Sequence, residues 1–417
     1  MPHSAKPGIR LRDADAFGAR LPPKNRPART LDVVRGQNIT RAGAHNRQLM
    51  LHHIRAKGPV TRLELTGLTG LTPPAVFKIT KDLIDEGLVH LTLHRDGSRG
   101  QPSSFLTINP DAAYAIGLNV DRNSIAFVVL DFGGNVREVV RQDVPSPSPT
   151  DVKEVLAKFY KASLKKYSTK PDDFVGIGLS IPHDLTKNSD PNLGVLWRAM
   201  SLEKLFTDIT PLPVILENDA AAASIGEMVF GAGLEVDTFI YLHIGVELGS
   251  GLVIDRRYVK GRTDRYSELG NLPKVNPFKS RETALATTIE NVASVDGFLA
   301  AFKAAGIPAA QPGDLDFDNA KVQDILRQWV GAVADFLYLP LLSTLSIINP
   351  DAVFIGGPLP PVVTDLLSLE VTKRLSLNIA VDWQERTVRP GKLTRNAAAV
   401  GAGVIAFRAF WDQNHAS

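Results

Sequence analysis

The residues best suited to chemistry in this chain are an acidic pair around an asparagine, Glu217-Asn218-Asp219, at the end of an apolar run. An alanine-rich segment follows and is expected to form a helix over residues 219–230. Three roles fit Asp219: a catalytic base, a ligand-binding carboxylate without chemistry, or a cap for this helix. The stretch itself leaves all three open, and capping does not exclude ligand binding.

A sugar kinase would also need glycine-rich turns that hold a phosphoryl donor, because only glycine lets backbone N–H groups approach the anion closely. The first position for such a turn has no glycine between Asn119 and Ser124. The second, "GVELGSG", keeps its glycines but places Val246 and Glu247 where small or hydroxyl residues would suit a phosphate. Glu247 would repel a phosphate. A glycine-rich turn without a ligand is therefore the favoured interpretation.

The elements that would position these residues alternate between strands and helices after Asn109-Pro110. Strands are expected at 113–121, 124–132, 136–144, 174–182, 213–219, 238–245, 251–259 and 352–357, and helices at about 151–167, 219–230, 282–306, 320–347 and 396–411. This alternation predicts open, mixed sheets flanked by helices, with Asn218 and Asp219 at the carboxyl end of a strand, where a ligand can lie between the sheets. Carboxylates and amides are also the groups that bind sugar hydroxyls.

Composition narrows the class of protein. The 417 residues exceed one ordinary core, so two or three domains are expected, and 44% hydrophobic with 22% charged residues is typical of a soluble globular protein. The chain has no cysteine, which excludes disulfides and thiolate metal sites, and its nine histidines form no convincing metal cluster. No apolar run approaches a membrane span, and the N-terminus has no apolar core of a secretion signal, so we expect a cytoplasmic protein.

The net charge of +3 hides an uneven distribution. Residues 1–110 carry 17 Lys and Arg against 8 Asp and Glu, a balance of +9, whereas the remainder carries 30 against 36, a balance of −6. A basic N-terminal part on an acidic body suggests a module that binds a polyanion. A basic tail without a partner fits the composition equally well.

Helical periodicity begins near Asn46, and residues 1–44 are expected to be irregular. Three short helices at about 46–57, 61–70 and 72–87 precede two strands at 88–94 and 103–109 around a glycine-rich loop. This is the order of a winged helix-turn-helix, in which the second and third helices read DNA. Thr72 is expected to cap the third helix, with Pro73 at its first position.

The third helix and the loop between the strands supply the candidate DNA contacts. Off the apolar stripe of the helix, or at its start, are Thr72, Pro74, Ala75, Phe77, Lys78 and Lys81. A lysine contacts phosphate or guanine, and an exposed phenylalanine can meet a thymine methyl group. In the loop, Arg95 and Arg99 lie beside glycines. The alternative is a winged helix used for protein contacts, and the basic charge of this segment favours DNA.

With these residues in place, the chain resembles the ROK family of sugar kinases and sugar-responsive repressors, and specifically its repressor branch with an N-terminal winged helix. The motifs that carry the resemblance occur in the family's order from about Asn46 to Trp411: "NRQLMLHHI", "EGLVH", "GQPSSFLTINPDAAYAIGLNV", "VGIGLSIP", "ENDAAAASIGE", "GVELGSGLVIDRRYVKG", "SELGN" and "INPDAVFIGG". The resemblance implies a basic tail (1–44), a winged helix-turn-helix domain (45–110) and a two-lobed, actin-like (ribonuclease H-like) domain (111–417). Lobe one would comprise about 111–216 with the helix 396–411, and lobe two about 217–395.

By this resemblance Asp219 matches the kinases' catalytic base, and Asn218 and Glu268 match sugar-contacting positions. The kinases' phosphate turns are replaced here, so no ATP is expected and Asp219 is assigned no catalytic role. Asn271 stands where a zinc-binding, sugar-contacting histidine is usual, so no zinc is expected and its amide takes a hydroxyl contact.

Three other positions bear on recognition. His183 replaces a glycine beside the expected ligand and Trp197 is retained, so both are candidate ligand contacts. Gln101 replaces the arginine usual at the tip of the wing, where it is a candidate DNA contact beside Arg99.

The sequence therefore predicts a transcriptional regulator, a repressor, that binds operator DNA as a homodimer or homotetramer and responds to a sugar or sugar derivative held between two lobes. Two alternatives remain: an ATP-dependent sugar kinase that also binds DNA, and a regulator that no longer senses a ligand. The sugar and the operator cannot be read from the sequence.

Overall fold

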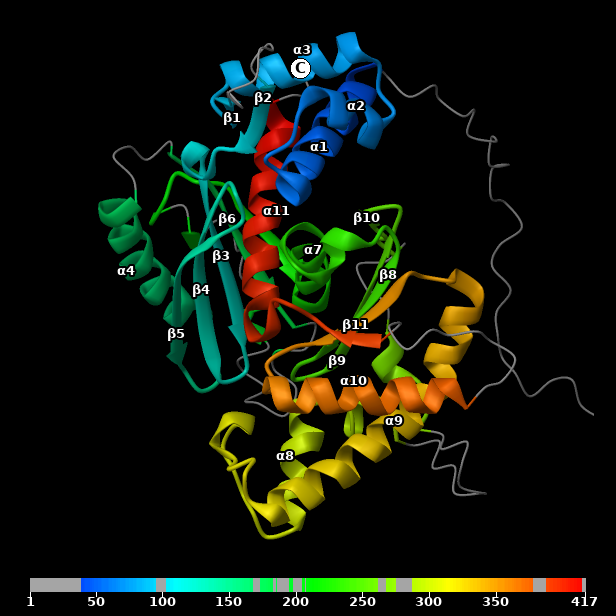
Figure 1. Cartoon of the computed structure of the whole chain (residues 1–417). Helices are drawn as coiled ribbons and strands as arrows, with labels where there is room; N and C mark the ends of the chain where they lie inside the picture. Colours follow the sequence, from blue (N-terminus) through cyan, green and yellow to red (C-terminus); the bar gives the residue numbers. More distant parts are fainter. Residues whose placement is uncertain are drawn as a thin grey trace, which may run out of the picture.

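The computed structural model describes residues 39–94, 103–167, 173–182, 185, 195–197, 205–206, 208–261, 268–274, 287–377 and 388–414 of the chain. This part is an α/β protein with a small N-terminal helical domain and two lobes, each built around a five-stranded sheet (Figure 1). The order of elements confirms the predicted fold class.

The N-terminal domain consists of α1 (Ile39–Lys57), α2 (Arg62–Thr69) and α3 (Pro73–Asp85), followed by the antiparallel pair β1 (Val89–His94) and β2 (Ser103–Ile108). Apolar residues of all five elements form its core, among them Met50, Ile54, Leu65, Val76, Leu83 and Leu106. A helix-turn-helix pair and a hairpin are thus held on α1, as the sequence pattern predicts.

Two details of this domain differ from expectation. Residues 39–44 were expected to be irregular, but they form the start of α1, and only residues 1–38 of the predicted tail lie outside the described residues. Thr72 has the extended backbone of an N-cap residue but makes no capping hydrogen bond through its side chain. Pro73 at the first helical position leaves one amide fewer to satisfy.

Lobe one contains β3 (Tyr114–Asp121), β4 (Ser124–Asp131), β5 (Val136–Asp143), β6 (Phe174–Ile181) and β7 (Val214–Asn218) in the order β5-β4-β3-β6-β7. β3 to β5 form an antiparallel meander, and β6 and β7 run parallel to β3. One face packs against α4 (Pro149–Tyr167). Parallel strands end at the same edge of a sheet, so the polar residues that end β3, β6 and β7 gather there.

Lobe two repeats this plan with β8 (Phe239–Ile244), β9 (Leu248–Ile254), β10 (Arg257–Tyr258), β11 (Ala352–Gly356) and β12 (Val388–Pro390) in the order β10-β9-β8-β11-β12. Its outer face packs against α8 (Val295–Ala304), α9 (Ala320–Ile348) and α10 (Pro361–Ser376). A large apolar cluster between sheet and helices holds the lobe together.

Two expectations for lobe two are wrong, and two of its elements were not predicted. The strand expected over 251–259 is split by a turn in which Asp255 and Arg256 have φ of 48° and 59°. Of the helix expected over 282–306, residues 282–286 lie outside the described residues, and α8 begins only at Val295, because Ser294 caps it and a 3-10 turn precedes it. The two elements that were not predicted are α10 and β12.

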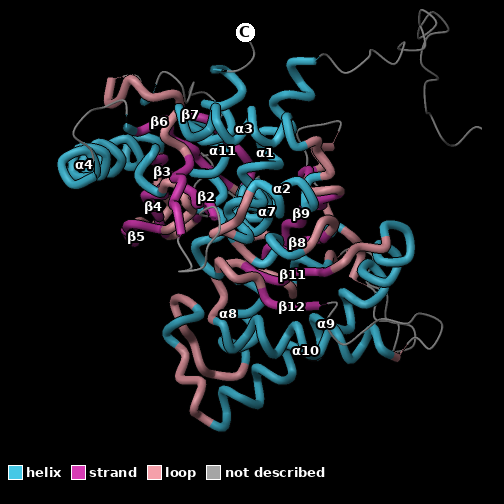
Figure 2. The backbone as a smooth tube through the Cα atoms, turned by 45° about the horizontal axis from the view of Figure 1, so that its top comes forward, coloured by secondary structure: helices cyan, strands magenta, loops and turns pink. Residues whose placement is uncertain are grey.

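Two alanine-rich helices, α7 (Asp219–Phe230) and α11 (Ala397–Asn414), lie side by side between the lobes (Figures 1 and 2). Glycines permit the close packing: a Cβ on Gly401 would lie 1.6 Å from the carbonyl oxygen of Ala222, and a Cβ on Gly117 of β3 would lie 1.8 Å from that of Ala399. α7 is therefore held firmly against α11 and, through α11, against the sheet of lobe one.

Among the described residues, α9 is long and apolar enough to cross a membrane by length and composition. Its buried residues, including Leu326, Trp329, Val333 and Leu337, belong to the core of lobe two. The core helix of a globular domain passes the same test, so α9 gives little support to a membrane span.

Candidate ligand site and nucleic-acid interface

The start of α7 presents two polar side chains at the edge of lobe one. The side-chain oxygen of Asn218 accepts hydrogen bonds from the amides of Ala220 (3.0 Å) and Ala221 (3.2 Å). Asn218 is therefore the N-cap of α7, and capping, one of three roles open to Asp219, falls mainly to its neighbour. Asp219 Oδ1 accepts a hydrogen bond from the Ala220 amide at 2.7 Å. Its other oxygen is left facing β8.

The side chain of His243, near the end of β8, lies opposite this carboxylate. Its Nε2 is 3.6 Å from Asp219 Oδ2, beyond hydrogen-bonding distance, and its Nδ1 is buried without a hydrogen-bond partner among the described residues. The side chains of His243 and Asp219 are only 8% and 14% exposed. Burial lowers the pKa of His243 to about 4 and raises the pKa of Asp219 to about 6. At neutral pH a neutral imidazole therefore faces an ionised carboxylate.

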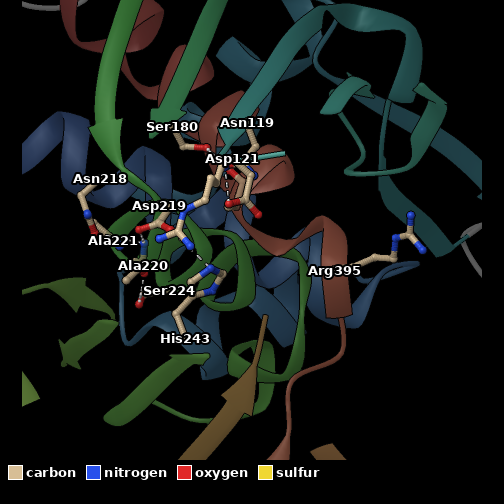
Figure 3. Close-up of polar contacts among 12 residues, drawn as sticks. Asn119, Asp121, Ser180, Asn218, Asp219, Ala220, Ala221, Ser224, His243 and Arg395 are labelled. Carbon is tan, nitrogen blue, oxygen red and sulfur yellow. Dashed lines mark hydrogen bonds and ion pairs between the residues drawn. The ribbon is translucent and has the colours of Figure 1, made fainter. Parts of the chain in front are cut away.

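A second carboxylate, Asp121 at the end of β3, belongs to the same cluster (Figure 3). Its Oδ1 accepts a hydrogen bond from the backbone amide of Arg122 at 2.7 Å. Burial raises the pKa of Asp121, and the negative charge of Asp219 raises it further. Next to it, Asn119 Oδ1 accepts a hydrogen bond from Ser180 Oγ of β6 at 2.9 Å. Three strand ends and the start of α7 thus assemble one polar cluster.

An ion pair joins the two lobes beside this cluster. Arg122, in the turn between β3 and β4 of lobe one, lies 2.5 Å from Asp296 at the start of α8 in lobe two. In the same region the carbonyl oxygen of Gly245 accepts a hydrogen bond from the amide of Val295 at 2.8 Å. A movement of one lobe relative to the other would therefore change the geometry of the cluster.

The other predicted ligand contacts have different surroundings. Glu268 and Asn271 are exposed and hydrogen-bonded to each other at 2.8 Å, and the described contacts do not bring them to Asp219. Trp197 is half-buried against the core of lobe one, where its indole N–H donates to the carbonyl oxygen of Pro147 at 3.1 Å. His183 lies outside the described residues.

Two members of the cluster, Asp121 and His243, were not predicted as site residues. Asp121 lies between Asn119 and Ser124, in the segment that lacks the glycine of a phosphate-binding turn. His243 is the one histidine in an otherwise apolar strand, "TFIYLHIG", which is a visible signal. Its approach to Asp219 depends on a pairing of two lobes that no local pattern reveals.

The candidate DNA-reading helix presents most of the predicted residues to solvent. Thr72, Pro74, Phe77, Lys78 and Lys81 are exposed and Ala75 is half-buried, with Phe77 at 55% exposure. The Arg62 guanidinium of α2 lies 5.1 Å from the centre of the Phe77 ring. Lys81 forms an ion pair with Asp85 one turn along the helix. Arg95, Arg99 and Gln101 lie outside the described residues.

α1 is the element that fastens the N-terminal domain to the lobes. The Arg55 guanidinium donates to the carbonyl oxygen of Phe132 at 3.1 Å and lies 5.5 Å and 5.1 Å from the ring centres of Phe132 and Phe230. One turn earlier, His52 Nδ1 lies 3.0 Å from Nη2 of Arg256, which also donates to backbone carbonyl oxygens around the end of α7. Burial lowers the pKa of His52 to about 3, so its imidazole is a neutral acceptor here.

α7 therefore contacts the polar cluster at its first residue and the N-terminal domain at its last. Asp219 begins the helix in the polar cluster, and Phe230 ends it against Arg55 of α1. At 1.5 Å per residue the helix spans roughly 18 Å. A single rigid element connects the candidate ligand site with the N-terminal domain.

The chain matches known proteins over most of its length. The family model described as ROK family covers residues 115–409. A xylose repressor of Bacillus spizizenii is 25% identical over 379 residues, which are 88% of this chain and 96% of that protein. A solved ROK family transcriptional regulator, a homologue of the Escherichia coli Mlc protein, covers 90% of this chain and 98% of its own with a TM-score of 0.61 at 22% identity. A ROK hexokinase from Thermus thermophilus covers 72% of this chain and 99% of its own, with a TM-score of 0.53 at 23% identity.

The chain belongs to the ROK family. Its match to the regulator includes the N-terminal helices, whereas the hexokinase matches a smaller share of the chain. The alignment with the xylose repressor also covers most of this chain and most of the repressor.

Proposed function

We propose that this protein is a transcriptional regulator, acting in the cytoplasm as a repressor, whose affinity for operator DNA changes when a sugar or sugar derivative binds at the start of α7. Two findings support the proposal: the repressors among its relatives match most of its length, and α3 presents an exposed face with Phe77 and Lys78. Asp219, with Asn218 beside it, is proposed to accept hydrogen bonds from sugar hydroxyls. Glu268, Asn271, His183 and Trp197 remain proposed contacts.

The observation that carries the proposal is the position of α7. A ligand that binds Asp219 displaces the first turn of α7. Because α7 packs closely on α11, we infer that the helix moves as a unit and does not bend. The displacement is then passed to Phe230 and so to Arg55 of α1. Ligand control also requires different affinities of the ligand for the two states of the protein, which the closing of the lobes across Arg122 and Asp296 can provide.

We infer that a homodimer or homotetramer is the form that binds DNA. One winged helix reads few base pairs, and two half-sites multiply the specificity. In such an assembly a small rotation of α1 relative to the lobes changes the spacing of the two α3 helices. The affinity for DNA would change because the two α3 helices would no longer match the spacing of the two half-sites.

We further infer that the protein is not a kinase and uses neither ATP nor zinc. Asp121 and Glu247 stand at the two turns that would face the phosphates of a nucleotide, and each would repel them. Asp219 is then a carboxylate that binds a hydroxyl without deprotonating it for transfer.

A sugar panel tests the sensing half of the proposal. Pentoses, hexoses and their amino and phosphorylated derivatives are screened for a shift in melting temperature, and the strongest ligand is added to a DNA-binding titration. The proposal predicts at least a fivefold change in DNA affinity and no ADP release from ATP with any sugar. Steady ADP release that Asp219→Asn abolishes would instead establish a kinase, and DNA affinity that no panel sugar alters would establish a regulator without this sensor.

The DNA half has its own test. A fragment selected from a random pool by the full-length protein is titrated at several salt concentrations with wild type, Lys78→Ala and Lys321→Ala. Lys78→Ala should weaken binding and lower the salt slope by about one if it removes a phosphate contact. Lys321, exposed at the start of α9, is the matched control and should bind as wild type. Equal affinity of all three would show that α3 is not the reading helix.

A further inference from the structure

We propose that Arg62 of α2 and Phe77 of α3 act together on DNA, with Arg62 reading a guanine and Phe77 the thymine of a neighbouring base pair. This inference rests on the proposed function and deepens it. It names the bases that the helix-turn-helix prefers and adds Arg62, which is not among the predicted DNA contacts. The contacts between α2 and α3 carry the argument.

Arg62, the first residue of α2, reaches across to α3. Its Nε donates a hydrogen bond to Thr80 Oγ1 at 2.8 Å, and its guanidinium carbon lies over the Phe77 ring, 5.1 Å from the ring centre. Thr80 is buried, and its hydroxyl donates in turn to the carbonyl oxygen of Val76 at 2.8 Å. The guanidinium is therefore held both at one edge and across one face.

The two remaining nitrogens of Arg62 are available to a ligand. Within the described part of the chain, neither Nη1 nor Nη2 has a hydrogen-bond partner, and the half-buried Arg62 side chain forms no ion pair. With Nε occupied, a bidentate contact falls to Nη1 and Nη2. Two parallel N–H donors on arginine are the group that matches O6 and N7 of a guanine in the major groove.

The Phe77 ring lies on the exposed face of α3. Spaced so that they share this face are Pro74, Phe77, Lys78 and Lys81, all of which are exposed. Phe77 is 55% exposed and does not belong to the apolar core of the domain. Its free surface can pack against an apolar group of a ligand, and the methyl group of thymine is the apolar group that the major groove offers.

The contact between guanidinium and ring determines which bases the two residues can reach. The groups lie 5.1 Å apart, and successive base pairs of B-DNA are roughly 3.4 Å apart along the axis. Two side chains in direct contact therefore reach the same base pair or adjacent ones. A base pair that contains guanine has no thymine, so the thymine must belong to the adjacent pair.

A phosphate contact is the alternative role for Arg62. Such a contact needs little more than a positive charge, which the flexible Lys78 on the same face can supply. The guanidinium of Arg62 is instead held by Thr80 and Phe77 before DNA binds, so little side-chain freedom is lost when a bidentate contact forms. A fixed, planar donor pair favours a base over a phosphate.

Base analogues in the operator test the inference on the full-length protein. In the fragment selected from a random pool, each guanine of a half-site is replaced in turn by 7-deazaguanine, which lacks N7, and each thymine by uracil, which lacks the methyl group. We expect one guanine and one thymine in adjacent base pairs to be sensitive, with affinity reduced roughly fivefold or more at the guanine and roughly threefold or more at the thymine.

Two variants assign these sensitivities to their residues. Arg62→Lys keeps the charge but loses the donor pair, so the guanine analogue should weaken its binding less than twofold. Phe77→Ala should lose the thymine effect in the same way. Arg327→Lys is the matched control, because Arg327 is an exposed arginine of lobe two that pairs with Asp324, and it should keep both effects.

Thr80→Val tests how Arg62 is positioned. Valine keeps the shape of the buried side chain but removes the acceptor of Arg62 Nε. The guanine effect should therefore fall to less than half of its wild-type size, while the thymine effect is retained. A role of Thr80 in folding alone would lower the melting temperature without changing the ratio of affinities for guanine and 7-deazaguanine.

Two results would overturn the inference while the proposed function stands. One is a wild-type half-site without a sensitive guanine and thymine in adjacent base pairs. The other is Arg62→Lys with the same guanine effect as wild type, which would make Arg62 a phosphate contact. If no DNA is bound at all, the proposed function and this inference both fail. The wild-type scan decides the question even where a variant fails to fold.

Discussion

Two carboxylates on the same helix have opposite surroundings. Glu227, in the last turns of α7, is fully buried, and its oxygens accept hydrogen bonds from the amides of Ala232 (2.7 Å), Lys392 (3.1 Å) and Leu393 (2.8 Å). Asp219, at the start of α7, keeps a small solvent-exposed surface, accepts hydrogen bonds from the Ala220 amide, its own backbone amide and the Asn218 side chain, and has an oxygen that faces the His243 imidazole beyond hydrogen-bonding distance.

The difference separates a structural acid from a binding one. Burying a charge is costly unless hydrogen bonds replace the lost water, and three backbone amides do so for Glu227. Burial raises the pKa of both carboxylates, that of Asp219 to about 6. The hydrogen bonds of Asp219 come from its own turn of α7 and leave Oδ2 directed at His243, whereas those of Glu227 come from Ala232, Lys392 and Leu393. A carboxylate that retains acceptor capacity in a nearly buried place can accept donors from a ligand, whereas a saturated one cannot.

Glu227→Ala should have the largest effect. It would leave three backbone amides without their acceptor and open a cavity at the end of α7, so we expect a loss of about 3–5 kcal/mol in the free energy of unfolding. Urea unfolding followed by circular dichroism measures it. Glu235→Ala, an exposed glutamate in the adjacent turn, is the control and should change little. A loss below 1 kcal/mol for Glu227→Ala would contradict its structural role.

Asp219→Asn should act in the opposite direction on stability. The folded-state pKa of about 6 lies above the ordinary value of 3.8, so ionisation in the fold is penalised increasingly as pH rises from about 4 to 6. The amide removes this penalty, and we expect the variant to be more stable than wild type by roughly 1–3 kcal/mol at pH 7.5. The gain should disappear below about pH 4, where both folded and unfolded wild type are protonated.

The same variant should lose the melting-temperature shift caused by the effector. A substitution that increases the free energy of unfolding but abolishes ligand binding identifies a residue that serves the ligand and not the fold. Destabilisation of Asp219→Asn at every pH would place Asp219 with Glu227 as a structural residue and remove the distinction between them.

His52→Gln should have the smallest effect. The folded-state pKa of His52, about 3, lies below the ordinary value of 6.5, so the stabilisation by neutral His52 is complete above about pH 6.5 and declines as pH falls toward 3. Glutamine can still accept from Arg256 without titrating. We expect it to reduce the loss of stability between pH 7 and 5 by about 1 kcal/mol, after allowance for partial solvent screening. Parallel pH profiles of variant and wild type would show that His52 does not control this interface.

Much of the fold can be predicted from the sequence because its signals are local. Periodicity and glycine placement locate the winged helix, the meander that begins at Tyr114 and the helix that begins at Asp219. The bend at Asp255 and Arg256 gives no such signal, because two non-glycine residues adopt positive φ there and the Arg256 side chain is anchored on distant carbonyl oxygens. α10 was not predicted although it has a sequence signal, because Val363, Leu367, Val371 and Leu375 recur at helical spacing.

The candidate site could be predicted only in part for the same reason. The identity of Asp219 as a key residue follows from its neighbours in sequence. Its partners Asp121 and His243 come from other strands, and Arg55 meets Phe230 only because the N-terminal domain packs on the end of α7. Such long-range contacts are set by tertiary packing, which residue patterns do not encode locally.

The central claim is that α7 carries the state of the ligand site to the DNA-binding domain. The most direct test is the response of Arg55→Met, in which a flexible apolar side chain keeps the packing on Phe132 and Phe230 but removes the guanidinium. DNA affinity is measured with and without the strongest ligand from the sugar panel. The account predicts that the variant binds this ligand with unchanged affinity, while its DNA affinity changes less than twofold on addition. A ligand response of Arg55→Met equal to that of wild type would contradict the account.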